Sequence, residues 1–253
     1  MAQAMIGGIL AKEIVKKEDI IASAATQNTI DKVAKEFGIN VTLDNREVAK
    51  ADIVFLAVKP FYYEEVIDGI KDVVDEKQLI ISVAAGKSVE WVENAFGGKK
   101  KIVRIMPNTP ALVGEAVTAI CPNANITDGE KQEIVELIAS FGLAQIVSEK
   151  IMDAVIAVSG SSPAYVFMFI EAMADAVVAE GMPRVQAYQF AAQSVLGSAK
   201  MVLETGKHPG ELKDMVCSPS GTTIEAVKVL EEKGFRSSII EAMSACADKS
   251  RNM

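Results

Sequence analysis

The stretch Ile53-Val54-Phe55-Leu56-Ala57-Val58-Lys59-Pro60 is an unbroken apolar run that ends at a lysine and a proline. A run of this kind predicts a strand that is buried on both faces of a parallel sheet. Two further runs have the same form: residues 79–83, followed by Gly86, and residues 101–106, followed by Pro107. Helical patterns lie between these runs. Strands and helices that alternate in this way predict a doubly wound α/β sheet.

The pattern changes after Ser148, where strand signals end and only helical patterns follow. We therefore expect two domains, residues 1–148 with the sheet and residues 149–253 built of helices. Thr127 and Glu130 have the spacing of a capping box, and Gly38 is placed to end a helix. The expected strands are 19–23, 53–58, 79–83, 101–106, 117–121 and 144–147. The expected helices are 1–16, 29–37, 63–74, 88–96, 127–141, 149–158, 163–180, 184–205, 209–216, 223–232 and 235–249.

Residues 163–180 form a helical segment that is apolar nearly all round, which is typical of a helix buried from every side. A small helical domain offers little cover of its own. We therefore expect a second subunit to cover this helix, which makes the protein an obligate homodimer. Burial within one chain is the alternative.

The amino-acid composition indicates which classes of partner the chain can bind and in which compartment it works. Its 253 residues include 34 acidic and 26 basic side chains, and the formal net charge is −8. An acidic surface argues against binding to nucleic acid or to an anionic membrane. Three widely spaced cysteines favour a reducing cytoplasm, and a single histidine, His208, leaves no histidine-based metal site. The uncharged run 154–170 is broken at 159–163, and the N-terminus lacks a basic region, so we expect neither a membrane span nor a signal peptide.

Three expected strands end in small residues or proline: Ala57-Val58-Lys59-Pro60, Ala84-Ala85-Gly86 and Met106-Pro107-Asn108-Thr109-Pro110. The carboxyl ends of parallel strands meet at the edge where open α/β sheets bind nucleotides. Small residues at this edge let the backbone approach a flat ring or a phosphate. Each segment taken singly can be explained as an ordinary turn. The three together on one edge of the sheet favour a ligand-binding function.

A second candidate is the hydroxyl-rich segment Ser218-Pro219-Ser220-Gly221-Thr222-Thr223-Ile224-Glu225. Thr222 and Glu225 have capping-box spacing, which predicts a helix start. Free N–H groups at a helix start suit a small carboxylate. A well-capped structural helix is the alternative interpretation.

Several short motifs, taken together and in this order, are specific enough to indicate a protein family. They are Phe55-Leu-Ala-Val-Lys-Pro60, Val83-Ala-Ala-Gly86, Arg104-Ile-Met-Pro-Asn-Thr-Pro110, Ser159-Gly-Ser-Ser-Pro-Ala-Tyr165, His208-Pro-Gly-Glu-Leu-Lys-Asp214 and Ser218-Pro-Ser-Gly-Thr-Thr223. With these motifs the whole chain resembles pyrroline-5-carboxylate reductase. The resemblance implies an α/β Rossmann-type domain followed by an all-α dimerisation domain. It also implies reduction of 1-pyrroline-5-carboxylate to L-proline with NADPH or NADH, the last step of proline biosynthesis, by dimers that often assemble further.

The resemblance also implies roles for individual residues. Thr223 would hydrogen-bond the ring nitrogen of the substrate, and Ser218 with backbone N–H groups would hold its carboxylate. The substrate site, formed with the partner subunit, is then Ser218, Gly221, Thr222 and Thr223. The cofactor contacts are Ala2, Ser23, Thr26, Asn45, Ala57, Val58, Lys59, Pro60, Ala84, Ala85, Gly86 and Asn108.

The chain departs from the family pattern at three places. The family opens with a strand and a Gly-x-Gly-x-x-Ala fingerprint, of which Met1 and Ala2 match only the end. We expect translation to begin upstream. Without the first strand, we expect the neighbouring strands to lose ladder partners and a buried groove to open between them. We expect such a chain to fold poorly and to bind cofactor weakly. Ser162 and Ser220 stand where the family has glycine, which strains them if φ is positive. The Ser23–Gln27 loop has no arginine for a 2′-phosphate, so both NADPH and NADH remain candidates.

Two other functions remain open at this point. One is a non-catalytic dimer module that has lost its cofactor site, and the other is a reductase of a different cyclic imine. Oxidation of NADPH or NADH with pyrroline-5-carboxylate distinguishes the expected enzyme from both.

Overall fold

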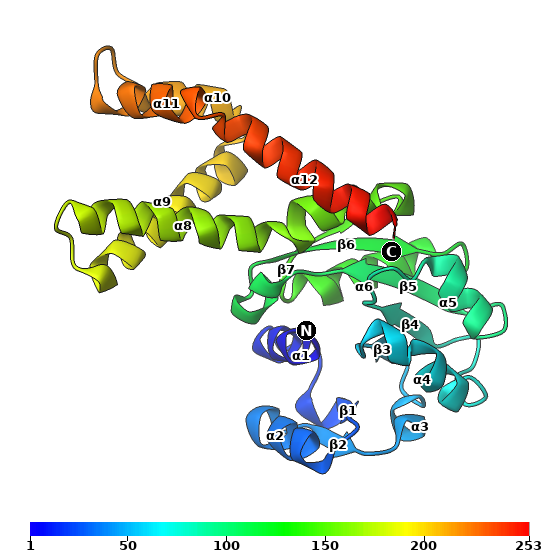
Figure 1. Ribbon diagram of the computed structural model, residues 1–253. Coiled ribbons are helices and arrows are strands. Elements are labelled where there is room, and N and C mark those ends of the chain that lie inside the picture. The colour runs from blue at the N-terminus through cyan, green and yellow to red at the C-terminus, as the bar shows by residue number, and fades with distance from the viewer. Residues whose placement is uncertain (253) are drawn as a thin grey trace. The chain divides into compact units, whose positions relative to one another are not determined.

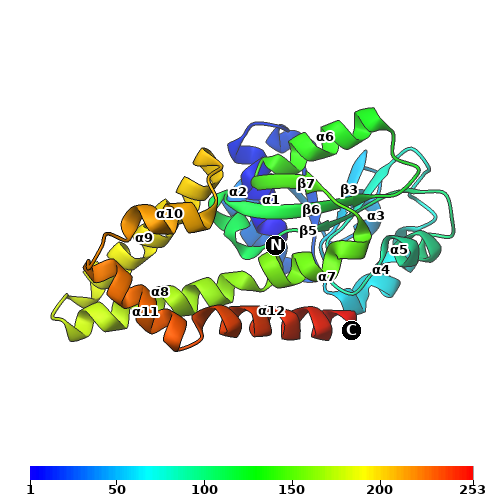
Figure 2. The ribbon, with the colours of Figure 1, turned by 90° about the horizontal axis from the view of Figure 1, so that it is seen from above.

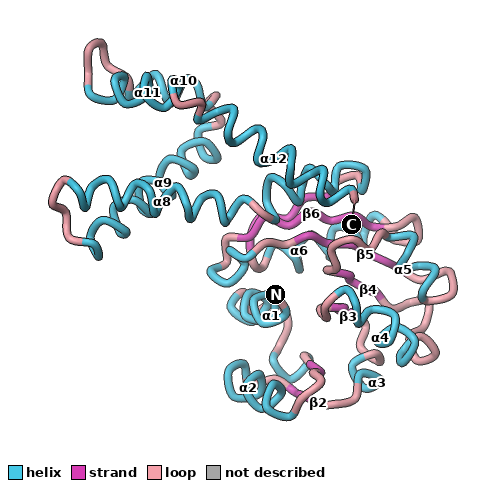
Figure 3. The backbone as a smooth tube through the Cα atoms, viewed as in Figure 1, coloured by secondary structure: helices cyan, strands magenta, loops and turns pink. Residues whose placement is uncertain are grey.

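The computed structural model describes residues 1–252, which form two compact units. The first unit is Met1–Gly160 together with the chain from Ala247 onward, and the second is Ser161–Cys246. All strands that the structure describes lie in the first unit (Figure 3). The sequence-based limits, 1–148 and 149–253, stay a prediction; residues 149–160 pack within the first unit.

The first unit alternates strands and helices in chain order (Figure 1). Its strands are β1 (Ile21–Ser23), β2 (Asn40–Thr42), β3 (Ile53–Leu56), β4 (Leu79–Ser82), β5 (Lys101–Met106), β6 (Ala116–Pro122) and β7 (Gly142–Ile146). Its α-helices are α1 (Ala2–Ala11), α2 (Gln27–Phe37), α3 (Asn45–Val48), α4 (Tyr63–Ile70), α5 (Val89–Ala95), α6 (Asp128–Ala139) and α7 (Met152–Val155). Short 3-10 turns are η1 (Lys17–Asp19), η2 (Pro60–Tyr62), η3 (Thr109–Val113) and η4 (Glu149–Ile151).

The expected doubly wound sheet is confirmed, with one difference in strand direction. Strands β3, β4 and β5 are parallel neighbours, but β5 and β6 are antiparallel. Residues 107–115 connect them through the single turn η3, and a connection this short cannot make the crossover that a parallel pair needs. β7 then pairs in parallel with β6.

Apolar side chains cover the two faces of the sheet alternately. Ile81 and Val103 point into a core shared with α1 and α6, whereas Ile80 and Ile102 point into a core shared with α4 and α5. Gly8 of α1 is needed for the first of these cores, because a Cβ atom there would lie 2.5 Å from the Cβ atom of Phe141. Helices on both faces of the sheet leave its carboxyl edge as the place where loops collect.

A groove separates β1 from β3. The pair β1–β2 forms a sheet of its own, and within residues 1–252 β3 pairs only with β4. The groove has a volume of about 650 Å³ and is lined by residues of α1, β1 and β3. The expectation of a groove between strands that lack a ladder partner on one side is therefore confirmed. The expectation that β3 is buried on both faces is wrong: Ile53 is 40% exposed because it lines this groove.

The first helix is shorter than its pattern predicts. The sequence pattern predicts a helix over residues 1–16, but α1 ends at Ala11, and Glu13 takes a φ of 53°. That left-handed residue turns the chain toward β1. The other local signals are confirmed: Gly38 ends α2 with a φ of 66°, and Thr127 and Glu130 form the expected capping box of α6.

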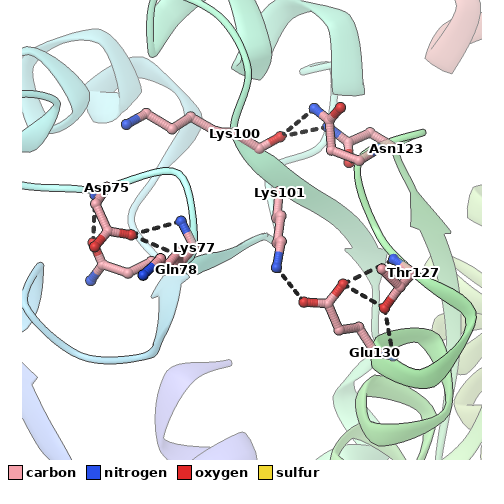
Figure 4. Close-up of polar contacts among 9 residues, drawn as sticks. Asp75, Lys77, Gln78, Lys100, Lys101, Asn123, Thr127 and Glu130 are labelled. Carbon is pink, nitrogen blue, oxygen red and sulfur yellow. Dashed lines mark hydrogen bonds and ion pairs between the residues drawn. The ribbon is translucent and has the colours of Figure 1, made fainter.

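The amino edge of the sheet is held by polar contacts (Figure 4). The Lys101 ammonium donates to Glu130 at 2.5 Å, and the same carboxylate accepts from the N–H and hydroxyl of Thr127 at 2.9 and 2.8 Å. The bond from Lys101, followed by those from Thr127, lowers the pKa of Glu130 to about 2. These contacts join the start of β5 to the start of α6, on the edge of the sheet opposite the carboxyl ends of β3, β4 and β5.

The second unit contains helices only (Figure 2). They are α8 (Ser162–Ala179), α9 (Arg184–Thr205), α10 (Pro209–Val216), α11 (Thr222–Glu232) and the greater part of α12 (Phe235–Arg251). Ser162 is the first residue of α8 and has no positive φ, so the expected strain at that serine is absent. Large apolar side chains of α8 and α9 are exposed in the single chain, among them Phe167 (63%), Met168 (68%) and Phe190 (64%).

One helical stretch, Glu149–Ala179, is long and apolar enough to cross a membrane by length and composition alone. A helix covered by protein in a water-soluble assembly passes the same test. Within the stretch a π-helical turn, Ile156–Gly160, precedes Ser161 and α8, at the place where the sequence predicts a break.

Candidate functional site

The predicted cofactor residues of β3 and β4 lie side by side at the carboxyl edge of the sheet. Leu56 and Ser82, the last residues of these strands, are paired in register. The loops Ala57-Val58-Lys59-Pro60 and Ala84-Ala85-Gly86 therefore leave the sheet at the same level. Ala84 is buried at the start of its loop, with 2% of its surface exposed. Gly86 has a φ of 74°, and no atom of the described residues lies within 4 Å of an added Cβ, so the backbone at Gly86 is open to a ligand.

The groove brings together a second set of predicted cofactor residues. They are Ala2, Ser23, Asn45, Ala57 and Val58, which come from α1, β1, α3 and the end of β3. The Ser23 hydroxyl donates to the Asn45 side-chain oxygen at 2.7 Å, so β1 and the start of α3 are tied at this point. A hydroxyl and an amide so placed suit the hydroxyls of a ribose.

The loop after β1 contains no basic side chain that could bind a phosphate. Thr26 instead caps α2 by accepting the Thr29 N–H at 3.4 Å. Arg46 follows Asn45, but its guanidinium donates to both carboxylate oxygens of Asp72 at 2.8 Å and to the Gly69 carbonyl at 2.9 Å. The bond to Asp72 raises the pKa of Arg46. The guanidinium therefore binds the last turn of α4 and the residues just after it, and not the loop after β1.

Asn108 has a structural task at the end of β5. Its side-chain nitrogen donates to the Ser159 carbonyl at 3.0 Å, and its oxygen accepts the Val117 N–H at 3.0 Å. The side chain is buried, and these two bonds hold the start of η3 against β6 and the π-helical turn. The remaining N–H of the amide is the part of Asn108 that a ligand could use.

Glu149 holds the far end of the loop that contains Ala84 to Gly86. One of its carboxylate oxygens accepts the Val89 N–H at 2.9 Å and the Arg104 guanidinium at 2.7 Å. Val89 begins α5, which follows the loop directly. Burial raises the pKa of the neighbouring Cys121 thiol to about 11, and Glu149 adds to the effect, so this cysteine stays a thiol.

Tyr63 holds the near end of the same loop, a role that the sequence does not predict. Its hydroxyl donates to the Leu56 carbonyl and accepts from Ser82 and from the Val83 N–H. Tyr63 begins a helix with an ordinary apolar pattern, and only the three-dimensional pairing of β3 and β4 brings its partners together. No sequence signal marks this tyrosine.

The predicted substrate residues form a tight turn between α10 and α11. The Gly221 N–H donates to the Ser218 carbonyl at 3.0 Å. A Cβ atom at Gly221 would lie 2.3 Å from the Ser218 hydroxyl oxygen, so only glycine lets that hydroxyl lie against the turn. Ser220 has a φ of 57°, which confirms the strain expected of a serine in a glycine position.

The predicted capping box of α11 is wrong. Gly221, in an extended conformation, is the N-cap residue, so Thr222 and Thr223 lie in the first turn and no side chain caps the helix. Glu225 binds Lys228 at 3.0 Å instead of reaching back to the helix start. The first-turn N–H groups of α11 thus have no side-chain acceptor among the described residues, and they share one turn with the hydroxyls of Ser218 and Thr223. This arrangement fits a small carboxylate better than a capped helix would.

The residues of the first unit fit a dinucleotide. Ser23 and Asn45 can hold a ribose, the uncapped start of α1 beside the groove can face a pyrophosphate, and the small loops at the strand ends admit a flat ring. Among the described residues, no group of three or more acidic, histidine or cysteine side chains could hold a metal ion.

Two family models match the chain. "Pyrroline-5-carboxylate reductase dimerisation" matches residues 149–253, and "NADP oxidoreductase coenzyme F420-dependent" matches residues 1–86. Among curated proteins, pyrroline-5-carboxylate reductase of Escherichia coli (strain K12) is 50% identical over 254 residues, which span all of this chain and 94% of that protein. Pyrroline-5-carboxylate reductase 2 of Homo sapiens is 39% identical over all of this chain and 81% of that protein.

Solved structures show the same likeness. A pyrroline-5-carboxylate reductase of Coxiella burnetii is 34% identical and superposes with a TM-score of 0.93 over 99% of this chain and 94% of that chain. Plasmodium falciparum pyrroline carboxylate reductase with NADP bound is 33% identical, with a TM-score of 0.88 over 98% of this chain and 92% of that chain.

Proposed function

Because the chain belongs to the pyrroline-5-carboxylate reductase family, we propose that its first unit binds the reduced nucleotide and its second unit binds the substrate. The chain is an oxidoreductase that reduces 1-pyrroline-5-carboxylate to L-proline, the last step of proline biosynthesis, with NAD(P)H as the reductant. The domain limits that we propose for these roles are 1–148 and 149–253.

The proposed nucleotide residues act by orientation. Ser23, with Asn45, binds the ribose of the adenosine, and Thr26 lies in the same loop. Ala57, Val58, Lys59 and Pro60 lie beside Ala84, Ala85 and Gly86, whose small side chains leave room for the nicotinamide ring. Ala2 faces the phosphates, and Asn108 offers its last N–H at the neighbouring strand end. When bound, the nucleotide supplies the hydride that reduces the imine carbon.

The observation that carries the substrate role is the uncapped, hydroxyl-lined start of α11. Its first-turn N–H groups and the Ser218 hydroxyl bind the carboxylate of pyrroline-5-carboxylate, and Gly221 keeps the turn closed enough for this. Thr222 belongs to the same first turn. Binding of this kind holds the ring in one orientation, and positioning supplies a large part of the rate enhancement of such a reaction.

Thr223 is the proposed catalytic residue. Its hydroxyl donates to the ring nitrogen, which gains negative charge as the imine carbon accepts hydride. A threonine hydroxyl is too weak an acid to supply a proton by itself, so it relays one from water. The residue is only partly buried, so water can reach it.

We also propose that the chain is a homodimer in the cytoplasm. The exposed apolar side chains of α8 and α9, together with the match to a dimerisation family, support a partner subunit that covers this surface. The three cysteines are all free, which suits a reducing compartment.

Purified chain with pyrroline-5-carboxylate tests the proposed function. We expect oxidation of NADPH or NADH to match L-proline formation mole for mole. The six-membered imine piperideine-2-carboxylate, offered under the same conditions, is the control for specificity. Turnover of the six-membered ring alone would assign the chain to another imine, and no turnover with either would leave a non-catalytic dimer.

A further inference from the structure

Tyr63 joins the ends of two strands through one buried hydroxyl. It donates to the Leu56 carbonyl at 2.5 Å, and it accepts from the Ser82 hydroxyl and from the Val83 N–H, each at 3.2 Å. One donated and two accepted bonds use the full capacity of a phenol oxygen. The side chain is 0% exposed, so these bonds do not compete with solvent.

The partners of this hydroxyl are the residues that immediately precede two loops. Leu56 comes directly before Ala57, and Val83 comes directly before Ala84. Leu56 and Ser82 are the last paired residues of β3 and β4, and the next backbone bond, from the Val83 N–H to the Leu56 carbonyl, is already long at 3.4 Å. The hydroxyl of Tyr63 thus bridges the strands at the rung where their own pairing weakens.

The ring that carries the hydroxyl is held in place by α5. The Trp91 ring lies 6.4 Å from it between centroids, and the Lys87 ammonium lies 3.6 Å above the Trp91 ring. Burial raises the pKa of Tyr63, although the bonds from Ser82 and the Val83 N–H oppose the rise. The hydroxyl therefore stays protonated at neutral pH and keeps its bond to the Leu56 carbonyl.

We propose that Tyr63 is a positioning residue of the reductase, which sets the spacing of the 57–60 and 84–86 loops so that both contact the nucleotide at once. It acts through the backbone of the strand ends. The proposal rests on the nucleotide role proposed above for these two loops.

The variant Tyr63→Phe tests this role because it keeps the ring and removes the bridge. We expect the KM for NADPH to rise about tenfold, as the loss of hydrogen bonds to one buried and one partly buried backbone group predicts. We expect the KM for pyrroline-5-carboxylate to stay unchanged and kcat to change less than the KM for NADPH. Ser82→Ala, which removes one accepted bond, should give a smaller rise. Tyr62→Phe, at an exposed neighbouring tyrosine, is the matched control and should change nothing.

Amide hydrogen exchange without nucleotide gives a second readout. In Tyr63→Phe we expect faster exchange in residues 57–60 and 83–88 and unchanged exchange in β5. A lowered Tm with an unchanged KM for NADPH and no local change in exchange would overturn the proposal. If Tyr63→Phe does not fold, Ser82→Ala decides by the same readouts. Hydrogen exchange needs neither substrate nor cofactor. A wild-type chain without activity would therefore contradict the proposed function, while the exchange measurement would still show whether Tyr63 holds the two loops.

Discussion

Thr223 carries the hydroxyl that we assign to the chemical step. In Thr223→Ala we expect kcat to fall roughly 10²-fold, because a donor that stabilises charge in the transition state is lost. The KM for NADPH should stay unchanged, since the residue belongs to the substrate turn. Steady-state kinetics with each substrate varied in turn measure both quantities.

The matched control for this change is Thr223→Ser, which keeps the hydroxyl and loses a methyl group. It should retain most of the turnover. Equal kcat values for Thr223→Ala and the wild type would remove Thr223 from the reaction.

Ser220 is strained by its φ of 57°, a conformation that glycine adopts without cost. We expect Ser220→Gly to stabilise the protein by about 1 kcal/mol. In a chain of this size that raises the Tm by about 2–4 °C, which calorimetry can measure. A lower Tm would show that other contacts of Ser220 outweigh the strain.

At the scale of single residues, some roles could be predicted and others could not. The strain at Ser220 could be predicted because serine stands there where the family has glycine. The contact with the Ser218 hydroxyl that requires glycine at 221 is visible only in the folded turn. Tyr63 bridges two strand ends, and Glu149 accepts two hydrogen bonds from different segments. Both arrangements depend on which strand ends lie side by side. That information exists only after the sheet has formed.

At the scale of elements, the contacts at the start of α6 contribute to the stability of the fold in a way that depends on pH. The bonds from Lys101 and Thr127 lower the pKa of Glu130 from its ordinary value of 4.5 to about 2. A carboxylate whose pKa is lower in the folded protein than in the unfolded chain stabilises the fold at every pH above its unfolded-state pKa. This contribution to the free energy of unfolding is lost as the pH falls from about 4.5 toward 2. Glu130→Gln should therefore lower the Tm at pH 7.

The difference in Tm between Glu130→Gln and the wild type should be largest above pH 5 and should shrink as the pH falls below 4.5. Thermal unfolding at a series of pH values measures it. A difference that grows on acidification would contradict the assignment of this ion pair.

Elements were predictable where one local signal dominates. Continuous apolar runs mark β4 and β5, and the capping box marks α6, because each pattern has one structural meaning. The direction of β6 was not predictable, since a short connection rules out a parallel neighbour only once the pairing is known. The helix start at α11 was misplaced by one residue because Gly221 can take the N-cap position that Thr222 also suits.

At the scale of the whole molecule, the exposed apolar face of α8 and α9 predicts a dimer. Phe167→Glu places a charge on this face, and we expect it to shift the protein from dimer to monomer in analytical ultracentrifugation. Tyr62→Phe, in the first unit, should leave the dimer intact. An unchanged dimer in Phe167→Glu would show that the interface lies elsewhere.

Hydride transfer from the nucleotide to the imine carbon is the central claim, and isotope labelling tests it directly. With NADPH or NADH that carries deuterium at the transferable position, we predict one deuterium in each L-proline, bound to the former imine carbon, as measured by mass spectrometry and NMR. Thr223→Ala should slow this transfer without changing where the deuterium appears. Proline that contains no deuterium, or deuterium lost to water during turnover, would contradict direct reduction by this chain.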